Sequence, residues 1–291
     1  MASKSTINFT ARDSEIITAL SRTPLDAKQL LRISRSFQHP FTSDRLVRRR
    51  MSQLANAGLV SCFQYATVTA GRVNYYKPTA LGFKLVFGPN AQLPSRAFFR
   101  EVSLSLQPHT RALADFVVAT YAAAETNQTT IKGFYRENQL ELSLGGKCIR
   151  PDCAFQLQLP DGRSLNYVVE IDCGTEPIRS TRERESLQQK ARFYDAYQSS
   201  SDKRFRVVVL FTKPSARVAH FADVARSVVS DQQRTLFYTG FLDHYTKAAN
   251  PLTDLLFEDR YERRQSLIPE SKLNHRFAKS SNLLANAQLV C

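Results

Sequence analysis

The sequence lacks any hydrophobic run long enough to cross a membrane. Its longest uninterrupted apolar stretch is Val207–Phe211, whereas a transmembrane helix needs about 20 such residues. The first ten residues hold no apolar core of the kind found in a signal peptide. Cysteine is scarce: five thiols, an odd number without framework spacing, argue against a disulfide-stapled secreted fold. We therefore expect a cytoplasmic protein with reduced thiols and no membrane partner.

The sequence also lacks zinc and relaxase patterns. Cys148, Cys153 and Cys173 form no paired C-x-x-C motif and have no nearby histidine, which indicates buried thiols rather than a zinc site. The histidines are scattered, whereas a nucleophilic tyrosine of the relaxase type would need a cluster of them as metal ligands. We therefore predict neither a zinc site nor a relaxase reaction with a nucleophilic tyrosine.

Acidic residues are scarce in the first third of the chain. Residues 1–100 hold 15 Lys or Arg against 4 Asp or Glu, and the other 191 residues hold 25 against 22. Nearly all of the formal net charge of +14 therefore lies in the first third. Such asymmetry is typical of a nucleic-acid-binding module joined to a nearly neutral second domain. A basic surface that only aids solubility is the alternative.

The first third has the pattern of three helices followed by a hairpin. Cap-type residues, with Thr10 before the first helix and Ser43 before the third, and apolar spacing predict three helices, and alternation predicts two strands: 10–21, 24–33, 44–57, 59–65 and 72–77. This is the order of elements in a winged helix, a relative of the helix-turn-helix. A short helix and a Gly- and Pro-containing linker follow, so we expect a winged-helix domain over residues 1–95.

The third predicted helix has an apolar back and a basic front. Val47, Met51 and Leu54 recur at helical spacing and form the inward stripe. A guanidinium front fits the major groove of double-stranded DNA and neutralises its phosphates. A solvated basic helix in an accessory domain is the alternative. The predicted DNA contacts are Arg45, Arg48, Arg49, Ser52 and, in the hairpin, Arg72.

Residues 96–258 have the pattern of an α/β domain. An Ala-rich helix is expected over 108–125, and a hairpin follows it. After the hairpin come a helix over 181–198 and the apolar strand 205–211, which implies a parallel βαβ crossover. A further helix and strand complete a mixed sheet flanked by helices. Residues 259–291 form a basic C-terminal tail.

Three carboxylates are predicted to meet at one end of the hairpin. A Pro-Asp-Gly-Arg turn divides the apolar stretch 153–171 into two strands. Folding the chain about the middle of that turn brings Asp152 opposite residue 171, within one position of Glu170 and Asp172. Carboxylates so placed suit a divalent metal, Mg²⁺ or Mn²⁺, with Asp152 and Glu170 as its ligands.

This arrangement of strands and acids resembles the core of the PD-(D/E)XK nuclease superfamily, which includes restriction endonucleases. The second motif of that superfamily normally ends in lysine, and Asp172 stands there in this chain. The resemblance implies that Lys190, on the following helix, substitutes for that lysine. The catalytic set it implies is Asp152, Glu170, Asp172 and Lys190.

Longer phrases of the sequence are similar to the replication-relaxation family of plasmid and mobile-element proteins. They are Arg-Pro-Asp-x-x-Phe at 150–155, Glu-Ile-Asp-Cys-Gly-Thr-Glu at 170–176 and Lys-Ala-Arg-Phe-Tyr at 190–194. The second phrase is the most specific of the three. The resemblance implies a role in the replication or relaxation of plasmid DNA.

Two functions remain open from the sequence. The first is a metal-dependent endonuclease that nicks plasmid or mobile-element DNA. The second is a non-catalytic winged-helix regulator with a degenerate nuclease-like domain. In that case the second domain contacts a relaxase, a replication initiator or a second copy of the chain as a homodimer.

Overall fold

The computed structural model describes residues 7–66, 73–174, 178, 186–213, 216–269 and 288–289. Arg72, the segment Thr175–Glu176 and most of the basic tail therefore lie outside the described residues. The chain divides into two compact units, Met1–Glu125 and Thr126–Val290. The first unit thus extends through most of the Ala-rich helix, past the boundary expected near residue 95. None of the described helices is long and apolar enough to cross a membrane.

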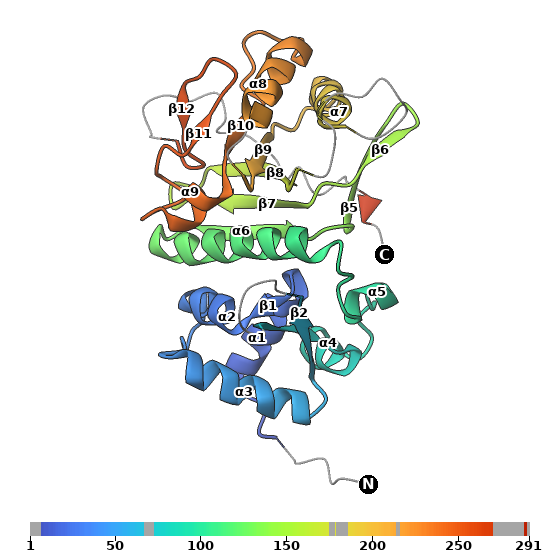
Figure 1. Ribbon diagram of the computed structural model, residues 1–291, viewed down its shortest axis with the longest axis vertical. Helices are drawn as coiled ribbons and strands as arrows, with labels where there is room; N and C mark the ends of the chain where they lie inside the picture. Colours follow the sequence, from blue (N-terminus) through green and yellow to red (C-terminus); the bar gives the residue numbers. More distant parts are fainter. Residues whose placement is uncertain are drawn as a thin grey trace. The chain divides into compact units, whose positions relative to one another are not determined.

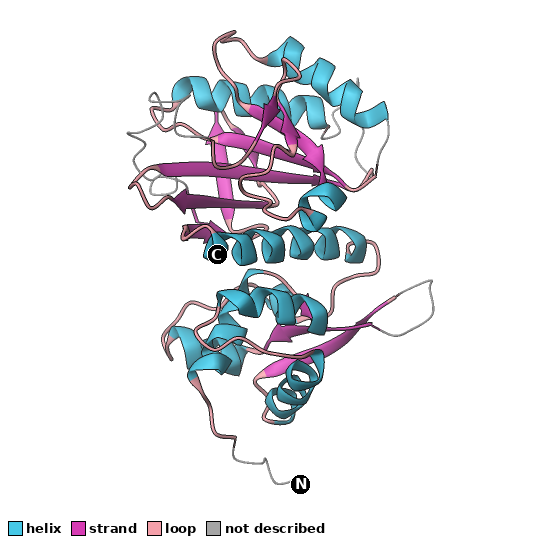
Figure 2. Ribbon diagram, turned by 90° about the vertical axis from the view of Figure 1, so that its left-hand side faces the viewer, coloured by secondary structure: helices cyan, strands magenta, loops and turns pink. Residues whose placement is uncertain are grey.

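The first unit combines helices with a small antiparallel sheet (Figure 1). Its sheet has the strand order β1-β3-β2, and β2 and β3 form a hairpin (Figure 2). The elements are α1 (Ala11–Arg22), β1 (Leu25–Asp26), α2 (Ala27–Ile33), a 3-10 turn (Ser34–Ser36), α3 (Asp44–Asn56), β2 (Val60–Tyr65), β3 (Val73–Pro78), α4 (Ala80–Phe87), α5 (Arg96–Phe99) and α6 (Gln107–Thr126).

Side-chain caps fix where the helices of this unit begin. Thr10 and Asp13 form a reciprocal capping box at the start of α1, and Ser43 caps α3 as predicted. Gly58, with a φ of +74°, follows the end of α3. The second helix was expected from Pro24, but it begins at Ala27. The two preceding residues instead pair with β3, and Asp26 caps the helix.

The core of the first unit joins α1, α2 and α3 to the sheet. Val47, Met51 and Leu54 are fully buried, as their spacing predicts, and Ala114 and Val118 of α6 belong to the same cluster. The backbone of α4 comes very close to that of Leu59 at Gly82, where an added Cβ would overlap the backbone carbonyl of Leu59. Glycine is therefore required there by the packing of α4 against the chain before β2.

The second unit is a mixed sheet with helices, which confirms the predicted α/β class. Its seven-stranded sheet has the order β12-β11-β10-β9-β8-β7-β4, with β8, β9 and β10 parallel. The elements are β4 (Thr130–Tyr135), β5 (Leu140–Leu144), β6 (Lys147–Ile149), β7 (Cys153–Gln158), β8 (Ser164–Asp172), α7 (Leu187–Ser200), β9 (Arg206–Phe211), α8 (Ala216–Val228), β10 (Phe237–Phe241), α9 (Leu242–Lys247), β11 (Phe257–Glu258), β12 (Arg264–Gln265) and β13 (Gln288–Leu289).

Helices α7 and α8 cover one face of this sheet (Figures 1 and 2). Tyr194 of α7 and Phe221 of α8 pack in one cluster with Val168 of β8 and Val209 of β9. The hairpin β11–β12 adds to the edge of the sheet, so residues 257–265 are part of the fold rather than of a separate tail. Glu170 and Asp172 lie on the face covered by these helices, since Lys190 of α7 bonds to Glu170 and Arg217 of α8 bonds to Asp172.

Candidate functional site

The hairpin β7–β8 places Asp152 beside Glu170. Cys153 pairs with Val169, and the backbone N–H of Asp152 donates to the carbonyl of Val169 at 3.1 Å. In this register Cys153 lies opposite Val169 rather than residue 170, so the expected register was wrong by one position. The ladder ends at this pair, and Asp152 lies just outside it. The charge of Asp152 raises the pKa of Glu170, so the two carboxylates lie near each other at this end of the hairpin.

The turn explains the shift in register. It spans five residues rather than four, because the N–H of Leu159 donates to the carbonyl of Arg163 at 2.8 Å. The centre of the hairpin is thus Asp161, followed by Gly162 at a φ of +83°. A centre half a residue earlier than expected moves every cross-strand partner by one position.

Glu170 is almost completely buried. Only 3% of the residue is exposed, Lys190 Nζ lies 3.0 Å from its Oε2, and the hydroxyl of Tyr194 donates to its Oε1. The pKa of Glu170 is raised to about 7: burial is the largest cause, the charge of Asp152 acts in the same direction, and Lys190 and Tyr194 act against both. The carboxyl therefore exchanges its proton near neutral pH.

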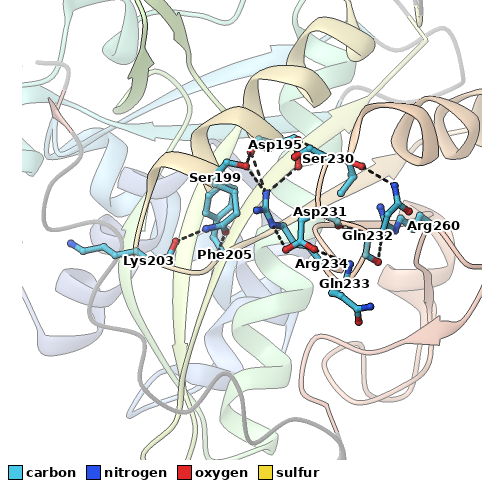
Figure 3. Close-up of polar contacts among 12 residues, drawn as sticks. Asp195, Ser199, Lys203, Phe205, Ser230, Asp231, Gln232, Gln233, Arg234 and Arg260 are labelled. Atoms are coloured by element: carbon cyan, nitrogen blue, oxygen red, sulfur yellow. Dashed lines mark hydrogen bonds and ion pairs between the residues drawn. The ribbon is translucent and has the colours of Figure 1, made fainter.

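Lys190 and Tyr194 reach Glu170 from one face of α7. They are four residues apart, so a helix places them side by side, and α7 begins directly after the cap Ser186. The residue after Tyr194, Asp195, holds α7 from another side: its carboxylate accepts from Ser230 Oγ at 2.8 Å and Arg234 Nη1 at 3.0 Å (Figure 3). The predicted meeting of Lys190 with the acidic strand is present in the structure, and Tyr194 joins it.

Asp152 lies at the start of β7 and is half-buried. Its Oδ2 accepts the backbone N–H of Ile171 at 2.6 Å, which ties the carboxylate to the neighbouring strand. Burial, and next the charges of Asp152 and Glu170, raise the pKa of the Cys153 thiol well above its ordinary value. Of the three thiols expected to be buried, Cys153 is buried, whereas Cys148 is exposed and Cys173 is only half-buried.

Asp172 does not join the other two acids. Its carboxylate is held by Arg217 of α8 through two hydrogen bonds, Nε–Oδ2 at 2.7 Å and Nη2–Oδ1 at 2.9 Å, and by the N–H of Gly174 at 3.0 Å. Only 2% of the Asp172 side chain is exposed. Among the described residues no group of three His, Cys, Asp or Glu side chains could hold a metal. The expected cluster of three carboxylates is thus a pair, with Asp172 in an ion pair beside it.

Arg217 is the residue of this site that the sequence interpretation missed. A positional signal existed, because α8 starts shortly after β9, and β9 runs parallel to β8 with Phe211 paired to Asp172. The first turn of α8 therefore lies at the strand edge where Asp172 ends. Arg150, two residues before Asp152, bonds to Glu141 at 2.8 and 3.0 Å.

The remaining pair of carboxylates still fits magnesium. Mg²⁺ binds through one or two carboxylates and completes its octahedron with water and substrate phosphates. Asp152 and Glu170 lie near each other, and Asp152 is only half-buried and so within reach of solvent. Oxygen donors without a free thiolate or imidazole favour Mg²⁺ or Mn²⁺ over zinc. The donor set therefore fits the metal that the sequence suggested.

The predicted DNA contacts on α3 lie on its exposed side. Arg45, Arg48, Arg49 and Ser52 are all exposed, and Arg48 forms an ion pair with Asp44 at 2.7 Å within the helix. Their neighbour Arg50 instead turns to the buried Asp13 and to the carbonyl of Asn8 at 2.8 Å. Arg48 and Arg49 therefore lie on the outer surface of α3, whereas Arg50 helps to hold the first unit together.

The comparisons with known proteins identify the family. The model of the replication-relaxation family matches residues 22–209, which is more than half of the chain. No curated protein and no solved structure matches the chain. The match spans the exposed face of α3, the carboxylate pair and Lys190. The chain belongs to the replication-relaxation family.

Proposed function

We propose that the protein binds double-stranded DNA through α3 and nicks it at Asp152 and Glu170 with the aid of Mg²⁺. Family membership supports a role in the replication or relaxation of plasmid or mobile-element DNA. The observation that carries the nuclease proposal is the placement of Lys190 3.0 Å from Glu170, beside Asp152, at the end of the parallel strands. Ligand sites of α/β sheets gather at that edge.

Two features of the fold support the assignment of a winged helix to the first unit and of a PD-(D/E)XK nuclease core to the second. The order helix, short strand, helix, helix and hairpin in the first unit is that of a winged helix, with α3 in the place of the recognition helix. The second unit has Pro-Asp at the start of one strand, Glu-x-Asp on the next, and a helix and a parallel strand after them, as in PD-(D/E)XK nucleases. Both assignments are part of the proposal.

In this proposal Asp152 and Glu170 hold the metal, and a bound Mg²⁺ supplies an activated water and stabilises charge on the scissile phosphate. Glu170 binds the metal only when ionised, and Tyr194 holds its carboxylate in one orientation. The Lys190 ammonium offsets the negative charge of the acids where the phosphate enters. Arg217 neutralises Asp172, so a strand of DNA meets three acids together with two cations rather than three bare carboxylates.

The test is a plasmid-nicking assay. Purified protein is incubated with supercoiled plasmid and Mg²⁺ or Mn²⁺, and Asp152→Asn and Glu170→Gln are compared with Asp161→Asn. Asp161 lies in the exposed turn of the same hairpin, so this substitution removes the same charge away from the site. We expect the wild type and Asp161→Asn to nick, and the two site variants to lose nicking at least about a hundredfold.

A non-catalytic regulator is the second candidate, and the pairing of Asp172 with Arg217 favours it. Ion pairs of this kind also stabilise folds that have lost their chemistry. No nicking by any form, together with no Mg²⁺ or Mn²⁺ binding in calorimetry, would refute the nuclease and leave the regulator. The regulator would then be supported by a metal-independent DNA footprint of the protein on its own promoter. That footprint should be lost in the triple variant Arg45→Ala, Arg48→Ala and Arg49→Ala.

A further inference from the structure

A groove with a volume of about 530 Å³ lies between the start of α1 and the face of α3. Its charged lining comes from Arg12, Arg49 and Arg50, with His39 beside them, and its apolar lining includes Phe41 and Leu46. None of the contacts predicted from the sequence, apart from Arg49, belongs to it. The groove thus combines cations with an apolar surface next to the proposed DNA-binding face.

The cations of this groove are not neutralised to the same degree. Arg50 is engaged by the buried carboxylate of Asp13. Among the described residues, neither Arg12 nor Arg49 has a carboxylate partner within ion-pair distance. The Arg12 guanidinium lies over the ring of Phe41, 4.7 Å from its centroid, and its Nε is buried without a hydrogen-bond partner. Packing on the ring restricts a cation whose charge is still available to a ligand.

We propose that this groove binds the sugar–phosphate backbone of the same DNA duplex whose major groove receives α3. Arg49 belongs both to the exposed face of α3 and to the groove, so the two surfaces are continuous. Arg12 and His39 take phosphate oxygens, and the deoxyribose packs against Phe41 and Leu46. Phosphate contacts position a protein on DNA without reading its sequence. The groove therefore sets the register in which α3 presents Arg45 and Ser52.

The start of α1 lies at the same place and adds to the attraction. Ala11, the first residue of α1, lines the groove, and the first N–H groups of a helix have no partner within it. Asp13 does not oppose this attraction, since Arg50 and the capping box with Thr10 occupy its carboxylate. This inference rests on the proposed DNA binding and extends it to a second surface.

The test compares Arg12→Gln with Arg22→Gln in the full-length chain. Both arginines are half-buried residues of α1 that stack on an aromatic ring, Arg22 on Tyr121 at 4.1 Å, but Arg22 lies at the opposite end of the helix. Binding to a short mixed-sequence duplex is measured by fluorescence anisotropy between about 50 and 200 mM salt. Glutamine keeps most of the stem that packs on the ring and removes the charge.

Loss of one phosphate contact lowers the salt slope, which is the slope of log affinity against log salt concentration, by about 0.9. It also weakens binding about fivefold near 0.15 M salt. We expect Arg12→Gln to show both changes on every duplex sequence, Arg12→Lys to restore the slope, and Arg22→Gln to bind as the wild type does. Wild-type affinity and slope in Arg12→Gln would overturn the groove while leaving DNA binding by α3 intact. A wild-type chain without salt-dependent binding would overturn both. Melting temperatures of the variants exclude loss of folding as the cause.

Discussion

The raised pKa of Glu170 makes a testable prediction about stability. Its folded-state pKa is about 7, against an ordinary value of 4.5, and burial is the largest cause. The folded protein therefore binds this proton more tightly than the unfolded chain does. The resulting stabilisation is fully present below about pH 4.5, declines as the pH rises, and is lost above about pH 7. At about 1.4 kcal/mol per pH unit, the difference amounts to about 3 kcal/mol.

The assay compares the wild type with Glu170→Gln by urea unfolding in EDTA. The glutamine variant does not titrate at this position, so the difference in unfolding free energy between the two proteins isolates Glu170. Circular dichroism follows the transition, since the chain has no tryptophan. We expect the wild type to lose about 3 kcal/mol relative to the variant between about pH 4.5 and pH 7.

Two results would contradict this reasoning. A difference that stays constant over the whole range would mean that burial of Glu170 has little effect on its proton. A wild type that gains stability relative to Glu170→Gln as the pH rises would mean that the charge of Lys190, 3.0 Å away, outweighs burial. Such a result would also mean that Lys190 outweighs the charge of Asp152, which raises the pKa of Glu170 as burial does.

Three other substitutions test the packing and the ion pairs. Arg217→Ala leaves the buried Asp172 carboxylate unpaired and should lower the unfolding free energy by about 3 kcal/mol, most of which Asp172→Asn should restore in the double variant; additive losses would contradict the pairing. Gly82→Ala forces a methyl group against a backbone carbonyl, so we expect a loss of about 1–3 kcal/mol in urea unfolding, and an unchanged midpoint would show that the helix shifts freely. Arg50→Ala should destabilise the chain by about 3 kcal/mol because it strands the buried Asp13, whereas the same change at an exposed arginine of α3 should cost under about 0.5 kcal/mol; equal melting temperatures would contradict this division.

Local signals in the sequence predicted much of the first unit. The caps Thr10 and Ser43 and the stripe of Val47, Met51 and Leu54 depend on neighbours within a few residues, and the structure contains them as expected. The two-residue strand before α2 was missed, because it exists only through its pairing with a strand some 50 residues later.

In the second unit the sequence predicted the buried strands but not the polar edges. Strand β4 contains Lys132 and Gly133, is mostly exposed and carries a bulge, so it shows no alternation that could be read. The pairing of Arg217 with Asp172 was missed for a different reason. It depends on α8 covering the same face as α7, which is a property of the packed sheet rather than of either segment.

The five-residue connection at Asp161 has a consequence for how this chain can diverge. Successive residues of a strand face opposite sides, so a single insertion that slipped β7 against β8 would turn Ala154 away from the face that it shares with Val168 and would also displace Asp152 from Glu170. A slip of two residues keeps the sides but separates the pair along the ribbon. Relatives that preserve the carboxylate pair are therefore free to vary this connection only where the extra residues stay outside the ladder.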